Sequence, residues 1–163
     1  MGRVALPYAL PSAGRGVAVS LLLVSGPNLS QLGTRDPGVY GSATLADLLA
    51  LVRAARPDAQ AFTSDSEGEL VARLHAARHD GTAAVIVNPG ALTHYSYALR
   101  DALELLAVPK VEVHLSQVHA REAFRRHSVI SPVVDVTIAG AGAYGYHLAA
   151  LAVAELLARR MRS

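Results

Sequence analysis

Residues 21–41 read LLLVSGPNLSQLGTRDPGVYG, and this stretch decides the fold because it joins a strand to an unusually long connection. The apolar run over residues 17–24 is typical of a strand covered on both faces of a parallel sheet. About twenty residues rich in glycine and proline follow before helical periodicity resumes near Ala43. A connection of that length inside a compact domain is usually either disordered or functional, often as a lid. It carries Asn28, Arg35 and Tyr40, so we interpret it as a lid over an active site.

The rest of the chain alternates short apolar strands with helices. Strands are predicted at residues 17–24, 59–63, 83–88, 110–115 and 133–139, and helices at residues 44–56, 64–79, 96–107, 118–126 and 143–161. Thr44 and either Ser64 or Ser66 are expected to cap the first two helices. This alternation predicts an α/β fold, a doubly wound five-stranded parallel sheet in three layers.

The composition indicates one domain and excludes several classes of function. At 163 residues, 52% of them hydrophobic, the chain can bury a sizeable core in a single catalytic domain at residues 17–163. A net charge of +2 with dispersed basic residues argues against a nucleic-acid partner, and the apolar runs are too short to span a membrane. The lack of cysteine excludes disulfides and thiol catalysis and is compatible with a cytoplasmic location. Residues 1–16 are expected to form a disordered extension rather than a targeting segment.

Two patterns suggest other functions. Gly140, Gly142 and Gly145 form a G-x-G-x-x-G between a predicted strand and the last helix, as in a dinucleotide site. Such a site also needs a following strand with an acidic ribose ligand, which this sequence does not supply, so close helix–strand packing is favoured. His75 and His79 have the i, i+4 spacing of a metal site but lack the glutamate of H-E-x-x-H, so solvated helix positions are favoured.

Three long motifs point to one family. GPNL, LGTRDP and VYG within residues 26–41, VIVNPGALTHYSYALRDAL from Val85 and VEVHLSQVHAREAFRRHS from Val111 occur in this order. Together they closely resemble the signatures of the type II 3-dehydroquinate dehydratases, cofactor-free enzymes of the shikimate pathway. The resemblance implies the flavodoxin-like strand order 2-1-3-4-5. It also implies elimination of water from 3-dehydroquinate to give 3-dehydroshikimate through an enolate, with no metal, nucleotide or Schiff base.

Polar groups follow the strands that should flank the site. Ligands of open parallel sheets bind beyond the carboxyl ends of the strands, where the strand order reverses. Alternation along the fourth strand puts Glu112 and His114 on one face, so the carboxylate can orient the imidazole and favour its charged form. Without the motif, a histidine at this strand end could equally be structural. The groups collected at the strand ends are Asn28, Asn88, His114, Leu115 and Ser116.

The resemblance assigns the catalytic roles. Tyr40 removes a proton from the carbon beside the substrate ketone, and Arg35 keeps the tyrosinate charged. A phenol has a pKa of about 10 and needs such a positive charge to ionise near neutral pH. Without the motif, a tyrosine in a loop is more often a packing residue. His114, with Glu112 as its partner, protonates the leaving hydroxyl, and Asn28 holds a water or the enolate oxygen.

The resemblance also assigns the substrate-binding groups. The backbone of Leu115 and Ser116, together with Asn88, binds the substrate carboxylate. Ser116 is expected to begin a helix, and backbone N–H groups at a helix start suit an anion. Arg125 contacts the ring hydroxyls together with His94.

The remaining assignments concern the lid and the assembly. Arg121 lies close to the lid by resemblance, and it is four residues from Arg125, so both can face one side of the helix predicted at residues 118–126. A solvated basic face is the alternative. Asp101 matches an aspartate that reaches into a neighbouring subunit's site, and the resemblance implies a homo-oligomer, a dodecamer of four trimers. A mean hydropathy of +0.29 agrees with apolar surface left for a partner.

Two other functional classes can share this fold: a nucleotide- or flavin-binding module and a non-catalytic regulatory relative. The presence of Asn28, Arg35, Tyr40 and His114 favours the enzyme. Dehydratase activity distinguishes among the three.

Overall fold

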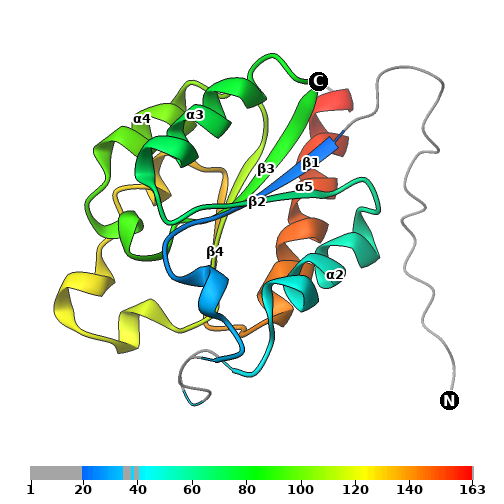
Figure 1. Ribbon diagram of the computed structural model, residues 1–163. Helices are drawn as coiled ribbons and strands as arrows, with labels where there is room; N and C mark the ends of the chain where they lie inside the picture. Colours follow the sequence, from blue (N-terminus) through cyan, green and yellow to red (C-terminus); the bar gives the residue numbers. More distant parts are fainter. Residues whose placement is uncertain (1–19, 35–37, 39–40, 163) are drawn as a thin grey trace, which may run out of the picture.

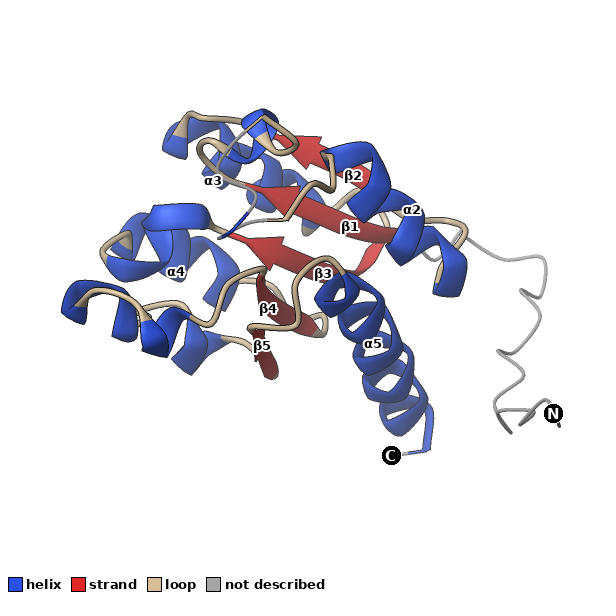
Figure 2. Ribbon diagram, turned by 90° about the horizontal axis from the view of Figure 1, so that it is seen from below, coloured by secondary structure: helices blue, strands red, loops and turns tan. Residues whose placement is uncertain are grey.

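The computed structural model describes residues 20–34, 38 and 41–162. Five parallel strands in this part of the chain form one sheet in the order β2-β1-β3-β4-β5 (Figure 2). The strands are β1 (Ser20–Ser25), β2 (Gln60–Thr63), β3 (Thr82–Asn88), β4 (Lys110–His114) and β5 (Val136–Ala139). The helices are α2 (Leu45–Ala55), α3 (Glu67–Ala77), α4 (Tyr97–Glu104) and α5 (Tyr144–Arg162). The predicted flavodoxin-like α/β fold and strand order are confirmed.

Helices cover both faces of the sheet and give the molecule three layers (Figure 1). Leu21 and Leu23 of β1 pack with α2 and α5 on one face, whereas Leu22 and Val24 pack with α3 and α4 on the other. All four side chains are buried. Successive side chains of a strand point to opposite faces, so the continuous apolar run serves two cores. Each of these buried side chains contributes about 1.5–3 kcal/mol relative to exposure.

The starts of α2 and α3 follow the predicted caps, and α4 has a serine cap that was not predicted. Thr44 and Asp47 form a capping box at the start of α2, and Ser96 caps α4 by accepting a hydrogen bond from the Leu99 N–H at 2.9 Å. Of the two candidates for α3, Ser66 is the cap. Such side chains accept from N–H groups that have no partner within the helix, and losing one costs about 1 kcal/mol.

Several predicted boundaries are wrong. The helices predicted to end at residues 79 and 107 end at Ala77 and Glu104. Just beyond these residues, backbone N–H groups donate to the carbonyl three residues earlier, as in a 3-10 turn, instead of four residues earlier. The fifth strand begins at Val136 rather than at residue 133, because Ser131–Val133 forms the 3-10 turn η5 around a proline. The first strand ends at Ser25, one residue beyond the prediction. Residues 1–19, with the predicted extension and strand start, lie outside the described residues.

The helix predicted at residues 118–126 is also wrong. Two 3-10 turns occupy this segment, η3 (Val118–Ala120) and η4 (Ala123–Arg126), and the backbone between them is extended. Neither turn buries a residue, and short helices in proteins depend on packing of an apolar face. Ser116 therefore begins no α-helix, and an N-terminal helix dipole cannot be its means of binding an anion.

The G-x-G-x-x-G segment is explained by turns and packing. Gly140 and Gly142 have φ values of +85° and +56°, in the region that favours glycine. Gly145 is buried, and a Cβ there would lie 3.4 Å from the Val113 side chain of β4. Gly140 and Gly142 therefore serve the turn before α5, and Gly145 packs against β4. No helix in the described part of the chain is long and apolar enough to cross a membrane.

Candidate active site

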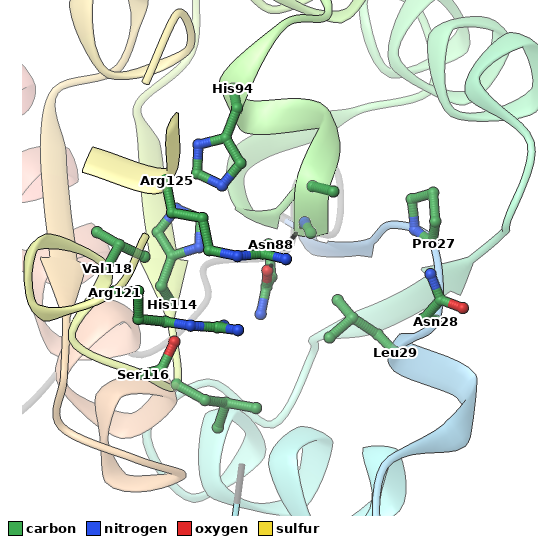
Figure 3. Close-up of a pocket in the computed structure, with 13 residues that line it drawn as sticks. Pro27, Asn28, Leu29, Asn88, His94, His114, Ser116, Val118, Arg121 and Arg125 are labelled. Atoms are coloured by element: carbon green, nitrogen blue, oxygen red, sulfur yellow. Dashed lines mark hydrogen bonds between the residues drawn. The ribbon is translucent and has the colours of Figure 1, made fainter. Parts of the chain in front are cut away.

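A pocket lies beyond the carboxyl ends of β1, β3 and β4, the position predicted from the strand order (Figure 3). Figure 3 shows Arg121, Arg125 and His114 on one side of it and Pro27, Asn28 and Leu29 on the other. The lining residues are Pro27, Asn28, Leu29, Asn88, Gly90, Ala91, His94, His114, Leu115, Ser116, Val118, Arg121 and Arg125.

The loops after β1 and β3 are packed directly against each other. The Gly26 N–H donates to the Asn88 carbonyl at 2.8 Å. A Cβ on Gly26 would lie only 2.5 Å from the Pro89 carbonyl oxygen, so only glycine permits this approach. Asn28 has a φ of +64°, and its N–H donates to the Asp65 carboxylate at 2.7 Å. Asp65, in the loop after β2, thus holds the backbone of Asn28, although it does not line the pocket.

Glu112 and His114 lie on one face of β4 and contact each other. His114 Nε2–H donates to Glu112 Oε1 at 2.8 Å. Its other ring nitrogen, Nδ1, has no hydrogen bond within the described part of the chain, so it is the nitrogen left for a ligand. Burial raises the pKa of Glu112, but hydrogen bonds from His114, Ser131 and Thr93 outweigh it and hold that pKa below its ordinary value. The buried carboxylate thus fixes the orientation of the imidazole.

Four hydroxyl residues around Glu112 were missed by the sequence analysis. They come from η2 (Gly90–His94), from the loop before η5, from η5 and from β5. No spacing rule points to them, because they lie between 16 and 25 residues from Glu112 along the chain. The available signal was the charge of Glu112 within an apolar strand, since a buried carboxylate must find donors. The four are Thr93, Ser128, Ser131 and Thr137.

His94 is held as a neutral acceptor. Its Nδ1 lies 2.7 Å from the His127 carbonyl oxygen and must carry a hydrogen, because a carbonyl only accepts. Burial lowers the pKa of His94, the carbonyl contact opposes this, and the nearby Arg125 guanidinium lowers it further. Nε2 of the neutral ring is then an acceptor. Phe124 packs edge-on against the imidazole, with 5.9 Å between ring centroids.

Arg121 and Arg125 both line the pocket, although no helix places them there. The extended backbone at Arg121 separates the two turns, and Glu122 links the two side chains. Its Oε2 lies 3.5 Å from Arg121 Nε and 3.1 Å from Arg125 Nε. Arg125 also stacks on Phe124, with Cζ 4.7 Å from the ring centroid. The alternative of a fully solvated basic face does not hold, since both side chains are mostly buried.

Asn88 is fixed at both ends of its amide. Nδ2 donates to the hydroxyl of Tyr146 at 2.8 Å, and Oδ1 accepts the Gly90 N–H at 3.1 Å. Tyr146, which the sequence analysis also missed, is completely buried in α5, and burial raises its pKa well above the ordinary value. One N–H of the Asn88 amide is therefore left for a ligand.

Some of the predicted site residues are not brought into the pocket. Asp101 is exposed on α4 and does not line it. Arg35 and Tyr40 lie outside the described residues. His75 and His79 are exposed, and the described part of the chain contains no group of three or more potential metal ligands.

Comparisons with known proteins agree with this arrangement. A family model described as Dehydroquinase class II matches residues 19–154. A 3-dehydroquinate dehydratase from Thermotoga neapolitana is 53% identical over 135 residues, 80% of this chain and 91% of that protein. One from Polynucleobacter asymbioticus is 49% identical over 144 residues, 86% of this chain and 97% of that protein.

Solved structures give the same result. The type II dehydroquinase from Butyrivibrio crossotus matches with a TM-score of 0.81 at 36% identity, over 85% of this chain and 99% of that one. That from Propionibacterium acnes matches with a TM-score of 0.79 at 42% identity, over 85% of this chain and 98% of that one. Fold, site and comparisons therefore agree that the chain belongs to the class II dehydroquinase family.

Proposed function

We propose that the protein is a 3-dehydroquinate dehydratase of the shikimate pathway, which eliminates water from 3-dehydroquinate to give 3-dehydroshikimate. The observation that carries the proposal is the Glu112–His114 pair, a buried carboxylate that fixes an imidazole at the edge of a pocket also lined by two arginines and two asparagines. An acid held at a pocket edge suits protonation of a leaving hydroxyl.

The elimination proceeds in two proton transfers. Tyr40, kept anionic by Arg35, removes the proton from the carbon beside the ketone, and the electron pair moves to the ketone oxygen to form an enolate. Asn28 stabilises the enolate oxygen directly or through a water. The enolate then reforms the ketone as the carbon–oxygen bond to the leaving hydroxyl breaks, and His114 gives that hydroxyl its proton. One water leaves, and the product is a conjugated enone.

Binding of the substrate uses the fixed groups of the pocket. The free N–H of Asn88 and the backbone of Leu115 and Ser116 bind the carboxylate. His94 accepts from a ring hydroxyl through Nε2, and Arg125 donates to one. Arg121 adds positive charge on the lid side. Groups whose orientation is already fixed lose little entropy when the substrate binds.

The reaction proposed here needs no cofactor and no imine. Lys110, the only lysine of the chain, opens β4, and its Nζ donates to the Leu106 carbonyl at 2.7 Å. It lies four positions before His114 along the strand, roughly 13 Å at 3.3 Å per residue. An amine that far from the pocket cannot attack a bound ketone.

We also propose a cytoplasmic homododecamer of four trimers, in which Asp101 reaches a neighbouring site. Tyr97, Asp101 and Leu105 are spaced four residues apart, and all three are exposed. Tyr97 and Leu105 are 63% and 52% exposed, which gives α4 an apolar edge beside the carboxylate. Light scattering and activity measured on the same samples across dilution test this, and a fully active monomer would contradict it.

Ultraviolet absorbance of the conjugated enone tests the activity. Purified protein should convert 3-dehydroquinate, whereas Tyr40→Phe should lose about a hundredfold or more of the turnover, because only the ionisable oxygen is removed. Arg35→Lys should rescue Arg35→Ala poorly, since an ammonium does not reproduce the guanidinium. An inactive wild-type protein, with its fold intact, would refute the proposed function.

A further inference from the structure

Glu112 is a fully buried carboxylate, and its side-chain hydrogen-bond partners among the described residues are all potential donors. We propose that the hydroxyl groups of Thr93, Ser128 and Ser131 are positioning groups that keep Glu112 anionic, so that the proton for the leaving hydroxyl resides on His114. The role in catalysis rests on the proposed function. The control of the charge on Glu112 is a separate physical claim and can be tested without substrate.

The hydroxyls are divided between the two carboxylate oxygens. Oε1 contacts His114 Nε2 at 2.8 Å, Ser128 Oγ at 3.1 Å and the Thr93 hydroxyl. Oε2 contacts Ser131 Oγ at 2.6 Å, Ser128 Oγ at 3.3 Å and Thr137 Oγ1 at 3.4 Å. The side chain of Glu112 has no exposed surface. Stabilisation of its charge must therefore come from these groups rather than from water.

The direction of the hydroxyl protons follows from the surrounding backbone. Ser128 Oγ accepts the N–H groups of Ile130 and Ser131 at 3.1 and 2.9 Å, which occupies its two lone pairs. Its own proton must therefore be donated, either to Glu112 or to Thr93 Oγ1 at 2.9 Å. In both arrangements Thr93 has no acceptor left on Ser128 and donates to Glu112. The loop geometry thus points hydroxyl protons at the carboxylate.

A shell of donors disfavours a proton on Glu112. A protonated carboxyl group would have to donate its own proton toward groups that already direct theirs inward. The anionic form can accept the protons that these groups direct toward it. The balance of burial and hydrogen bonds, which leaves the pKa of Glu112 below its ordinary value, agrees with this geometry.

Other charged or titratable groups around the pair do not change this assignment. His94 is held neutral, and Glu122 is engaged with Arg121 and Arg125. Positive charge near the pair would favour an anionic Glu112 further. Among the described residues, the titratable or charged side chains that line the space around His114 and the hydroxyls are His94 of η2, His119 of η3, Arg121 between the two turns, and Arg125 and Arg126 of η4.

The test is a pH titration of Glu112 in the absence of substrate. Infrared spectra of protein with ¹³C-labelled glutamate report the C=O stretch of a protonated carboxyl group, and Glu112→Gln identifies the band of Glu112. Ser131→Ala removes one donor to the anion, so Glu112 should take up its proton about one pH unit higher than in the wild type. Ser131→Thr restores a hydroxyl and should restore the wild-type midpoint.

Thr82→Val is a matched control. Thr82 Oγ1 also donates to a carboxylate, Asp80 Oδ1, at 2.6 Å, but at the opposite end of the sheet. It should leave the midpoint of Glu112 unchanged. An equal shift in Thr82→Val, or no shift in folded Ser131→Ala, would overturn the proposal. Thr93→Val removes a donor to Glu112 Oε1, so it should also raise the pH at which Glu112 takes up its proton. If Ser131→Ala does not fold, the midpoint measured in Thr93→Val tests the proposal in its place.

Enzyme assays separate this claim from the proposed function. Ser131→Ala should lower kcat with little change in KM, most strongly at low pH, because Glu112 becomes protonated there and no longer supports a proton on His114. A shifted midpoint in a chain whose wild type does not convert 3-dehydroquinate would refute the proposed function and leave the charge control of Glu112 standing. An unshifted midpoint in a protein that does convert 3-dehydroquinate would refute the charge control of Glu112 and leave the proposed function standing.

Discussion

The polar side chains at the two ends of the sheet differ in how their hydrogen-bonding groups are used. At the amino end, Lys110 Nζ donates to the Leu106 carbonyl, and Asp80 accepts both the N–H and the hydroxyl of Thr82. At the carboxyl end, His114 and Asn88 are each fixed by one partner but keep a further hydrogen-bonding group for a ligand. At the carboxyl end, fixed orientation and unused hydrogen-bonding groups are combined inside a pocket, and that combination is what a binding site requires.

One strand, β4, contains a polar residue of each kind. β4 begins at Lys110 and ends at His114, so substitutions at its two ends compare a structural polar group with a proposed catalytic one. The supporting groups differ as well. Glu112 is completely buried and surrounded by hydroxyls, whereas Asp80 is exposed.

The largest effect on activity is expected for His114→Ala. Loss of the acid should lower kcat by about 10²–10⁴-fold, because the leaving hydroxyl would depart without a positioned proton donor. KM should change far less. Steady-state kinetics with circular dichroism as a fold control measures this, and a loss below tenfold would remove His114 from the mechanism.

Glu112→Gln should destabilise the protein by about 1–3 kcal/mol at neutral pH, because an amide N–H₂ faces donors where the carboxylate accepted from them. The pKa of Glu112 is lowered in the folded state, so its contribution is present above the ordinary value of 4.5 and is lost as the pH falls through the folded pKa. The stability difference between wild type and variant should therefore shrink below pH 4.5. Denaturant unfolding across this range measures it, and a difference that grows on acidification would contradict the account.

Asp65→Ala should have an intermediate effect. The Asp65 carboxylate holds the N–H of Asn28, whose backbone has a positive φ. Without it the loop loses its fixed position, and kcat should fall by about tenfold, since small displacements of a catalytic group are costly. Asp65→Asn keeps an acceptor oxygen and should retain most of the activity. Equal losses in the two variants would show that the charge of Asp65, rather than its hydrogen bond, is what the site needs.

The smallest effect is expected at the other end of β4. Lys110→Met should leave kcat within about twofold of the wild type, because Lys110 lies roughly 13 Å from the pocket along an extended strand. Borohydride added with substrate should not inactivate the protein, since no imine forms. Substrate-dependent labelling of Lys110, detected by mass spectrometry, would contradict both the mechanism and the proposed site.

The sequence predicts well what local patterns determine. Apolar runs locate the strands, and Thr44 and the pair Ser64 and Ser66 locate two helix starts, because capping depends on a few neighbouring residues. The alignment of Glu112 with His114 follows from the two-residue period of a strand. The strand order came from the resemblance, and the switch-point rule then placed the pocket.

The rest depends on contacts between distant parts of the chain. Tyr146 lies 58 residues from Asn88, and Asp65 lies 37 from Asn28, so no spacing rule could pair them. The helix expected at residues 118–126 failed for a related reason: the spacing of Arg121 and Arg125 fits a helix, but no buried face stabilises one. Arg121 instead reaches the pocket from the extended backbone after η3, and Arg125 reaches it from η4.

The most direct test of the central claim, that the carboxyl end of the sheet is a dehydratase site needing no cofactor, follows the reaction itself. Proton NMR of 3-dehydroquinate, mixed with wild-type protein dialysed exhaustively against EDTA, should show the vinyl proton of 3-dehydroshikimate growing in. The His114→Ala protein at the same concentration should leave the substrate unchanged over the same period. Unchanged substrate with the wild-type protein, or equal rates for the two proteins, would contradict the account.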